Sequence, residues 1–142
     1  MSESRGFVAV LRSIGAVLAG IVVSILLAFA TDELMHLAGL APPIGQLMSD
    51  PMLAVAAAYR TIYSVLASYL IAALVGRRPM LHAMIGGVLG FIASMVGVVS
   101  TWNDAARYGP HWYPISLVVT ALPAAWLGGK LYMIRSTKSS QA

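Results

Sequence analysis

Cysteine is absent from this chain, and charged residues are scarce. With no cysteine among its 142 residues, the protein has no disulfide framework, no thiolate zinc site and no catalytic thiol. Charged residues make up 10% of the chain, against about a quarter in a soluble domain. Together with 59% hydrophobic residues and a mean hydropathy of +0.83, this scarcity excludes a water-soluble globule and a disordered chain.

The sequence also lacks the short motifs of common enzymes. It contains no G-x-S-x-G nucleophile elbow, no H-E-x-x-H zinc motif and no phosphate-binding Walker loop. Its nine basic residues are scattered among apolar segments, so they form no face for nucleic acid. The sequence therefore favours a protein that is not an enzyme and holds no cofactor.

Four long apolar runs dominate what is present. A membrane helix needs roughly 20 consecutive apolar residues. The runs, and the Pro- and Gly-containing breaks between them, predict helices over residues of about 10–38, 52–75, 80–101 and 114–134. This pattern is typical of an all-α membrane protein. We expect four transmembrane helices in an antiparallel up-down bundle, with residues 1–142 forming one integral-membrane domain.

The basic residues predict the orientation of this bundle, because Lys and Arg collect on the cytoplasmic side of a membrane. Seven of the nine fall on one side of the predicted helices: Arg5, Arg12, Arg77, Arg78, Lys130, Arg135 and Lys138. Four acidic residues fall on the opposite side: Asp32, Glu33, Asp50 and Asp104. We therefore expect both chain ends in the cytoplasm and the protein in the inner membrane of a bacterial cell.

The first 30 residues have a second interpretation, as a cleaved secretory signal. Arg5 and Arg12 precede an apolar run, and cleavage after Ala30 would leave three helices. The run from Ile14 to Ala30 has 17 residues, however, which is longer than the usual apolar core of a signal. We therefore expect an uncleaved first helix, with cleavage as the alternative.

Small residues recur at four-residue spacing along each predicted helix. Helices in lipid associate through small residues, because these let the backbones approach closely. The expected packing residues are Gly20, Ser24, Ser64, Ser68, Gly86, Gly90 and Ser94. They predict close packing within the bundle, and association in the bilayer with a second copy or with other membrane subunits.

Arg60 is the one charged residue that lies well inside a predicted helix. An ionisable residue in a bilayer is expensive and usually pairs with another group or marks a functional site. Counted from the cytoplasmic ends of the helices, Asp32 lies roughly 27 Å and Arg60 roughly 22 Å across the membrane, one helical turn apart. Asp32 is the expected partner, Glu33 is the alternative, and Tyr63 is close enough on the helix to join them. This polar site either binds a molecule or locks two helices together.

The same residues allow a metal site as a competing interpretation. Glu33 and His36 have E-x-x-H spacing, and Asp32 is four residues before His36, so a carboxylate and an imidazole share one helical face. Asp104 and His111, in the other outer loop, are further candidate ligands. These five residues define the alternative function, a membrane-embedded metal-binding or redox protein.

Three segments carry a resemblance to known proteins. The first helix ends in Thr-Asp-Glu-Leu-Met-His (31–36), the second contains Tyr59-Arg60, and Gly-Pro-His-Trp-Tyr-Pro (109–114) precedes the fourth. This pattern resembles small four-helix bacterial inner-membrane proteins of unassigned function, which implies a topology but no catalytic residue. The sequence thus predicts a small multi-pass inner-membrane protein. We expect it to be oligomeric or a subunit of a transport-type assembly, with a buried polar pair near the periplasmic face.

Overall fold

Four long helices make up most of the part of the chain that the structure describes. The computed structural model describes residues 2–43 and 46–139. The helices are α1 (Ser2–Leu37), α2 (Asp50–Val75), α3 (Pro79–Thr101), the short α4 (Ala105–Tyr108) and α5 (Trp112–Ser139), and the described residues contain no strand. The four long helices are long and apolar enough to cross a membrane. The predictions of an all-α fold and of four helices long and apolar enough to span a membrane are thereby confirmed.

Proline and glycine set both ends of α2 and the start of α3. Pro51 lies in the first turn of α2, where its missing N–H leaves no bond unmade. Gly76 ends α2 with a left-handed backbone (φ 75°), and Arg78 repeats that conformation (φ 49°) before Pro79 begins α3. The turn between α2 and α3 is therefore as short as the sequence predicts.

The first and last helices of the chain, α1 and α5, are longer than expected. α1 begins at Ser2 instead of residue 10, and α5 continues to Ser139 instead of ending near residue 134. Both extensions contain polar stretches, residues 2–6 of α1 and 135–139 of α5, and neither has a helix-breaking proline. Loss of apolar character does not by itself end a helix. The short α4 also falls in a stretch that we expected to be a loop, and it closes with the Gly109 amide donating to the Ala105 carbonyl.

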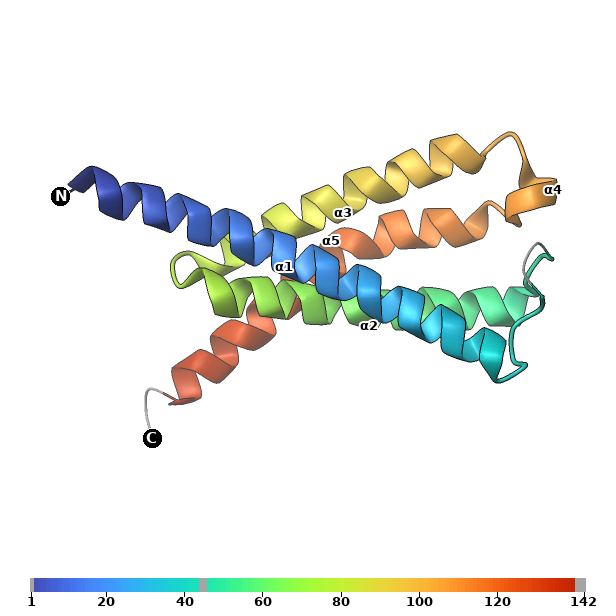
Figure 1. The fold of residues 1–142 in the computed structure, drawn as a ribbon, viewed down its shortest axis with the longest axis horizontal. Coiled ribbons are helices and arrows are strands. Elements are labelled where there is room, and N and C mark those ends of the chain that lie inside the picture. The colour runs from blue at the N-terminus through green and yellow to red at the C-terminus, as the bar shows by residue number, and fades with distance from the viewer. Residues whose placement is uncertain (1, 44–45, 140–142) are drawn as a thin grey trace.

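The helices pack in a chain of neighbours and do not form a closed square. α2 and α5 share an extensive interface, α1 packs mainly on α2, and α3 packs mainly on α5. In Figure 1 the start of α1, the α2–α3 turn and the end of α5 lie at one end of the molecule, here called the turn end. The end of α1, the start of α2 and α4 lie at the opposite end, here called the loop end. α1 and α3 diverge toward the loop end.

The core is built from small residues around one large side chain. Ile71 of α2 is the largest fully buried side chain among the described residues, at 1% exposure. A Cβ atom added to Gly20 of α1 would overlap the Ile71 side chain, and one added to Gly86 of α3 would lie 2.6 Å from its Cδ1 atom. On α5, a Cβ atom at Gly128 would lie 2.8 Å from the Cβ of Ser68 and would overlap a backbone carbonyl of α2. Glycine thus allows three helices to approach α2 closely.

The expected packing residues have two overlapping roles. Gly20, Ser68 and Gly86 lie at the helix contacts just described. Ser68 and Gly86 also line a cavity between the helices, together with Ser24, Ser64, Gly90 and Ser94. The sequence analysis missed Gly87, where a Cβ atom would overlap Ala125 of α5. Adjacent residues of a helix point about 100° apart. Gly86 therefore faces α2 while Gly87 faces α5, and a single stripe cannot identify both.

Arg12 joins α1 to the turn end of α2. Its Nε atom donates a hydrogen bond of 2.7 Å to the Leu74 carbonyl oxygen. Its guanidinium also lies where a side chain at Gly76 would be, since an added Cβ there would be 3.1 Å from Cζ. Cations favour the carbonyl end of a helix, so this contact satisfies an acceptor that the end of α2 leaves free.

Candidate functional site

A cluster of polar side chains joins α1 and α2 toward the loop end. The Arg60 Nη2 atom lies 2.5 Å from the Asp32 Oδ2 atom, in the one ion pair within the described part of the chain. The Tyr59 hydroxyl donates to the other carboxylate oxygen, Oδ1. Both oxygens of Asp32 are therefore engaged. The side chains of Arg60 and Asp32 are 35% and 25% exposed, so the pair is partly and not fully buried.

The structure brings together some of the predicted residues and adds one. Asp32 and Arg60 are paired, but Glu33 is exposed on the neighbouring face of α1. The Tyr63 hydroxyl lies 2.7 Å from the Thr31 Oγ1 atom and not against the ion pair. Tyr59 takes the place expected for Tyr63, and the two rings are neighbours, with centroids 5.7 Å apart.

The spacing of the two tyrosines explains this arrangement. Tyr59 and Tyr63 are four residues apart and therefore share one face of α2, where each contacts one of two adjacent α1 residues. Spacing along α2 alone pointed to Tyr63, three residues after Arg60, and not to Tyr59 directly before it. The signal that identifies Tyr59 is its position one turn before Tyr63, on the face that meets α1.

The candidate metal ligands are not gathered into one group. Within residues 2–43 and 46–139, no three His, Asp or Glu side chains lie together in a way that could hold an ion. The His36 Nδ1 atom donates to the Asp32 backbone carbonyl at 2.8 Å. His111 instead bonds to the Trp102 carbonyl at 2.9 Å and stacks on the Trp102 ring. Asp104 lies directly before α4. The last two candidates thus belong to the α3–α5 connection, while α1 packs mainly on α2.

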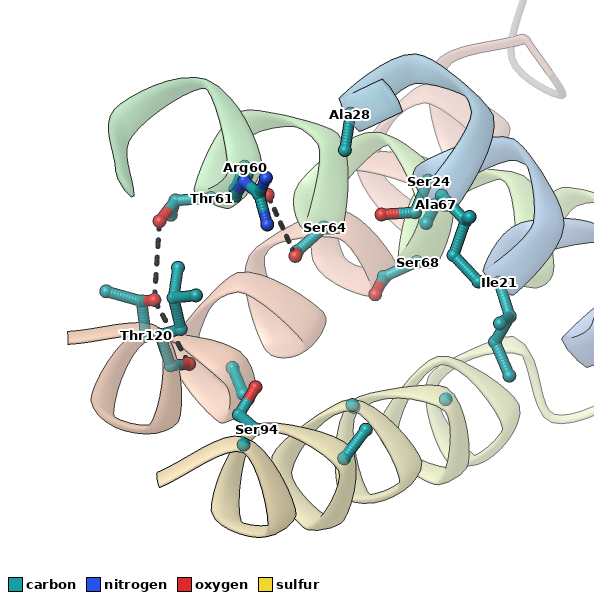
Figure 2. Close-up of a pocket in the computed structure, with 18 of the residues that line it drawn as sticks. Ile21, Ser24, Ala28, Arg60, Thr61, Ser64, Ala67, Ser68, Ser94 and Thr120 are labelled. Carbon is teal, nitrogen blue, oxygen red and sulfur yellow. Dashed lines mark hydrogen bonds between the residues drawn. The ribbon is translucent and has the colours of Figure 1, made fainter. Parts of the chain in front are cut away.

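An internal cavity begins beside the ion pair. It has a volume of about 440 Å³ and is lined by residues of α1, α2, α3 and α5, with Arg60 among them. Toward the turn end it reaches Ile71 and Gly86. Figure 2 shows hydroxyl side chains from all four helices around this space, including Ser24, Ser94 and Thr120. The rest of the lining is mainly glycine, alanine and branched aliphatic side chains.

Three hydroxyl groups of the α2 and α5 walls, those of Thr61, Ser64 and Thr120, donate their protons within the protein. Ser64 Oγ donates to the Arg60 carbonyl at 3.0 Å, as an i to i−4 bond within α2. Thr61 Oγ1 bonds to Thr120 Oγ1 at 3.3 Å and links α2 to α5, and the Thr120 hydroxyl lies 2.9 Å from the Ser116 carbonyl (Figure 2). These walls are therefore only weakly polar, and the charge at the cavity comes from Arg60.

The Arg60 guanidinium keeps a buried donor that has no acceptor among the described residues. A guanidinium carries five N–H donors and no acceptor. One contact of Arg60 is the bond to Asp32, and its Nε atom is buried with no acceptor among the described residues. An unmet donor away from water is costly. The group that the cluster lacks is thus a hydrogen-bond acceptor.

The candidate site consists of the ion pair, Tyr59 and the cavity next to them. α1 supplies the carboxylate, α2 supplies the guanidinium and the phenol, and all four long helices supply the cavity walls. No family model matches this chain, and neither a curated protein nor a solved structure matches it.

Proposed function

We propose that this protein is a binding subunit of a transport-type assembly in the bacterial inner membrane, and that it holds a membrane-dissolved molecule in its internal cavity. The observation that carries the proposal is a cavity of about 440 Å³ between four apolar helices, with an ion pair beside it. Volumes of roughly 300–1,000 Å³ are usual for small-molecule sites in proteins. Ionisable residues at this depth in a membrane protein are functional sites by default.

The dimensions of the cavity favour binding over conduction. Its lining extends along α2 from Arg60 to Ile71, which is about 16 Å at the rise of an α-helix. A volume of about 440 Å³ over that length gives this half-open cavity a mean cross-section of about 27 Å², or a mean width of about 6 Å. A helix, about 10 Å across, does not fit into this space. A path for a hydrated solute would have to form between copies of the chain or with other subunits.

The charge distribution supports the proposed position of the site. With most basic residues at the turn end, the loop end faces the periplasm. The ion pair then belongs to the outer half of the bilayer, where a molecule could be exchanged with a periplasmic partner, and the cavity extends from it toward the cytoplasmic half. The inner membrane and the assembly are both parts of this proposal.

Filling the cavity tests the proposal. Gly90 lines the cavity, and a Cβ atom added there would meet nothing within 4 Å among the described residues. Gly90→Leu therefore occupies the space without a clash. Gly15→Leu is the matched control, because Gly15 is equally open on α1 but lies outside the cavity lining. Native mass spectrometry of the purified full chain measures the small molecule that each variant retains from the membrane.

We expect the wild type and Gly15→Leu to retain one bound molecule and Gly90→Leu to lose it. A wild-type chain that retains no more than Gly90→Leu does would overturn the binding role. Equal retention by all three proteins would mean that the molecule lies on the outer surface, and would overturn it as well.

A further inference from the structure

We infer that the occupant of the cavity is a single-chain amphiphile, with an anionic head group at Arg60 and its hydrocarbon tail between α1 and α3. This inference rests on the proposed function and assigns the ligand class of the same site. It depends on three observations, which concern the head group, the tail and the route of access.

The head group follows from the hydrogen bonds of the cluster. Both Asp32 oxygens already accept bonds, from Arg60 and from Tyr59. Arg60 has a buried Nε atom without an acceptor, and about a third of its side chain remains open beside the cavity. The open part of a guanidinium presents only N–H donors, so this side of the cluster favours a ligand that brings an acceptor. Carboxylates and phosphates are the acceptors that bind a guanidinium most strongly.

The tail follows from the width, length and chemistry of the cavity. Non-bonded carbon atoms approach to about 3.5–4.0 Å, so a channel about 6 Å wide admits one hydrocarbon chain and not two side by side. An extended chain advances about 1.2 Å per bond, so about 14 carbons match the 16 Å length. The walls facing that chain are mainly apolar, with Ile21, Ile25 and Ala28 on α1 and Gly90, Ala93 and Gly97 on α3, beside the hydroxyl groups of Ser24 and Ser94.

The route of access follows from how the helices diverge. α1 packs mainly on α2 and α3 mainly on α5, and α1 and α3 separate toward the loop end (Figure 1). Residues of both helices line the cavity. A lipid-like molecule can thus enter sideways from the bilayer between α1 and α3, with its head at the depth of Arg60. A polar solute gains nothing from such a route.

Photo-labelling tests this ligand class directly. The probe is tetradecanoate with a diazirine near the methyl end, added to the full chain in nanodiscs of neutral phosphatidylcholine. Peptide mapping identifies the labelled residues. Unlabelled tetradecanoate, tetradecanol and tetradecyltrimethylammonium are the competitors, because they share one tail and differ in the head group. Phosphatidylglycerol is a fourth competitor, and tests whether an ordinary anionic lipid with two chains does as well.

We expect saturable labelling within residues 21–28 of α1 and 86–97 of α3. Tetradecanoate should compete about tenfold better than tetradecanol, which corresponds to one charge-assisted hydrogen bond, and the ammonium should compete least. The double variant Arg60→Leu with Asp32→Asn should keep the tail labelling but lose the preference for the acid. Arg107→Gln, which changes an exposed arginine of α4, is the matched control and should keep that preference.

The failures of the two proposals are distinguishable. Labelling that stays in the cavity but is displaced equally by the acid, the alcohol and the ammonium would overturn the anionic head group and leave the binding cavity intact. Labelling spread over the lipid-facing sides of the helices would overturn both. Displacement by phosphatidylglycerol as effective as by tetradecanoate would overturn the single-chain ligand.

Discussion

Asp32, Tyr59 and Arg60 satisfy one another only as a set. Removing the guanidinium would leave a carboxylate among apolar helices with the Tyr59 hydroxyl as its remaining side-chain partner. Removing the carboxylate would leave the guanidinium without its anion. Breaking one side of a fully buried pair costs about 3–5 kcal/mol, whereas exposed pairs contribute less than about 1 kcal/mol. At 35% and 25% exposure this pair lies between those limits.

Arg60→Ala should therefore lower the free energy of unfolding by roughly 1–3 kcal/mol. Arg60→Leu with Asp32→Asn should recover much of that loss, because both charges are removed together. Denaturant unfolding in detergent, followed by circular dichroism, measures both. Recovery of stability without the preference for an anionic head group would assign the pair to ligand binding, whereas recovery of stability with that preference retained would make it a lock between α1 and α2. An unchanged stability of Arg60→Ala would contradict the pairing itself.

The Asp32–Arg60 contact could be predicted from depth along two helices and from the face that Arg60 shares with small residues. Its surroundings could not. Tyr59 and Tyr63 lie one helical turn apart on α2. Which of them contacts Asp32 depends on how far α1 is displaced along its axis relative to α2, and residue spacing within one helix does not determine that displacement. The positions of Asp104 and His111 depend on the α3–α5 connection, whose path is likewise not encoded in the periodicity.

Contacts between helices depend on single glycines whose neighbours are known only after folding. Gly90 and Gly128 have the same place in the sequence pattern, as small residues inside apolar helices. A Cβ atom at Gly128 would press on the α2 backbone and on Ser68, while one at Gly90 would meet open space. The two positions should therefore respond to the same substitution in opposite directions.

Gly128→Ala should lower the free energy of unfolding by about 1–3 kcal/mol, because overpacking forces α5 away from α2. Gly90→Ala should leave stability unchanged or raise it by up to about 1 kcal/mol, because alanine is the better helix former. Unfolding curves of the two variants, measured side by side in one detergent, check this. Similar losses at both sites would show that the α2–α5 contact is not as close as described.

The sequence predicted the presence of the four long helices correctly, and it predicted their lengths less well. Apolar runs locate the part of a helix that lipid can cover, which is why α2 and α3 match their predicted bounds within two residues. The polar ends of α1 and α5 carry no apolar signal, yet nothing in them interrupts the backbone. A hydropathy pattern therefore underestimates a helix that extends beyond the bilayer.

At the scale of the whole molecule, the turn end and the loop end differ in charge, and this difference predicts which end faces the cytoplasm. Since the chain has no native cysteine, one introduced cysteine reports on one position. Ala106→Cys marks the loop end and Ser136→Cys marks the turn end, and both residues are exposed. In intact bacterial cells, a membrane-impermeant maleimide should label Ala106→Cys at once. It should label Ser136→Cys only after the membrane is permeabilised. The reverse pattern would invert the orientation and place the ion pair nearer the cytoplasm.

The Asp32–Arg60 pair also has a consequence for how the chain is made. An arginine near the middle of a membrane helix costs about 2.5–3.5 kcal/mol during insertion, so α2 is a poor substrate for the translocon by itself. α1 is synthesised first and ends with the aspartate that pairs with this arginine. Because α1 is synthesised before α2, Asp32 is already present when Arg60 has to pass from the translocon into the bilayer. The two helices are thus suited to leave the translocon together as a hairpin in which Asp32 neutralises Arg60. The order of synthesis therefore lowers the cost of inserting the charge that lies beside the cavity of the finished protein.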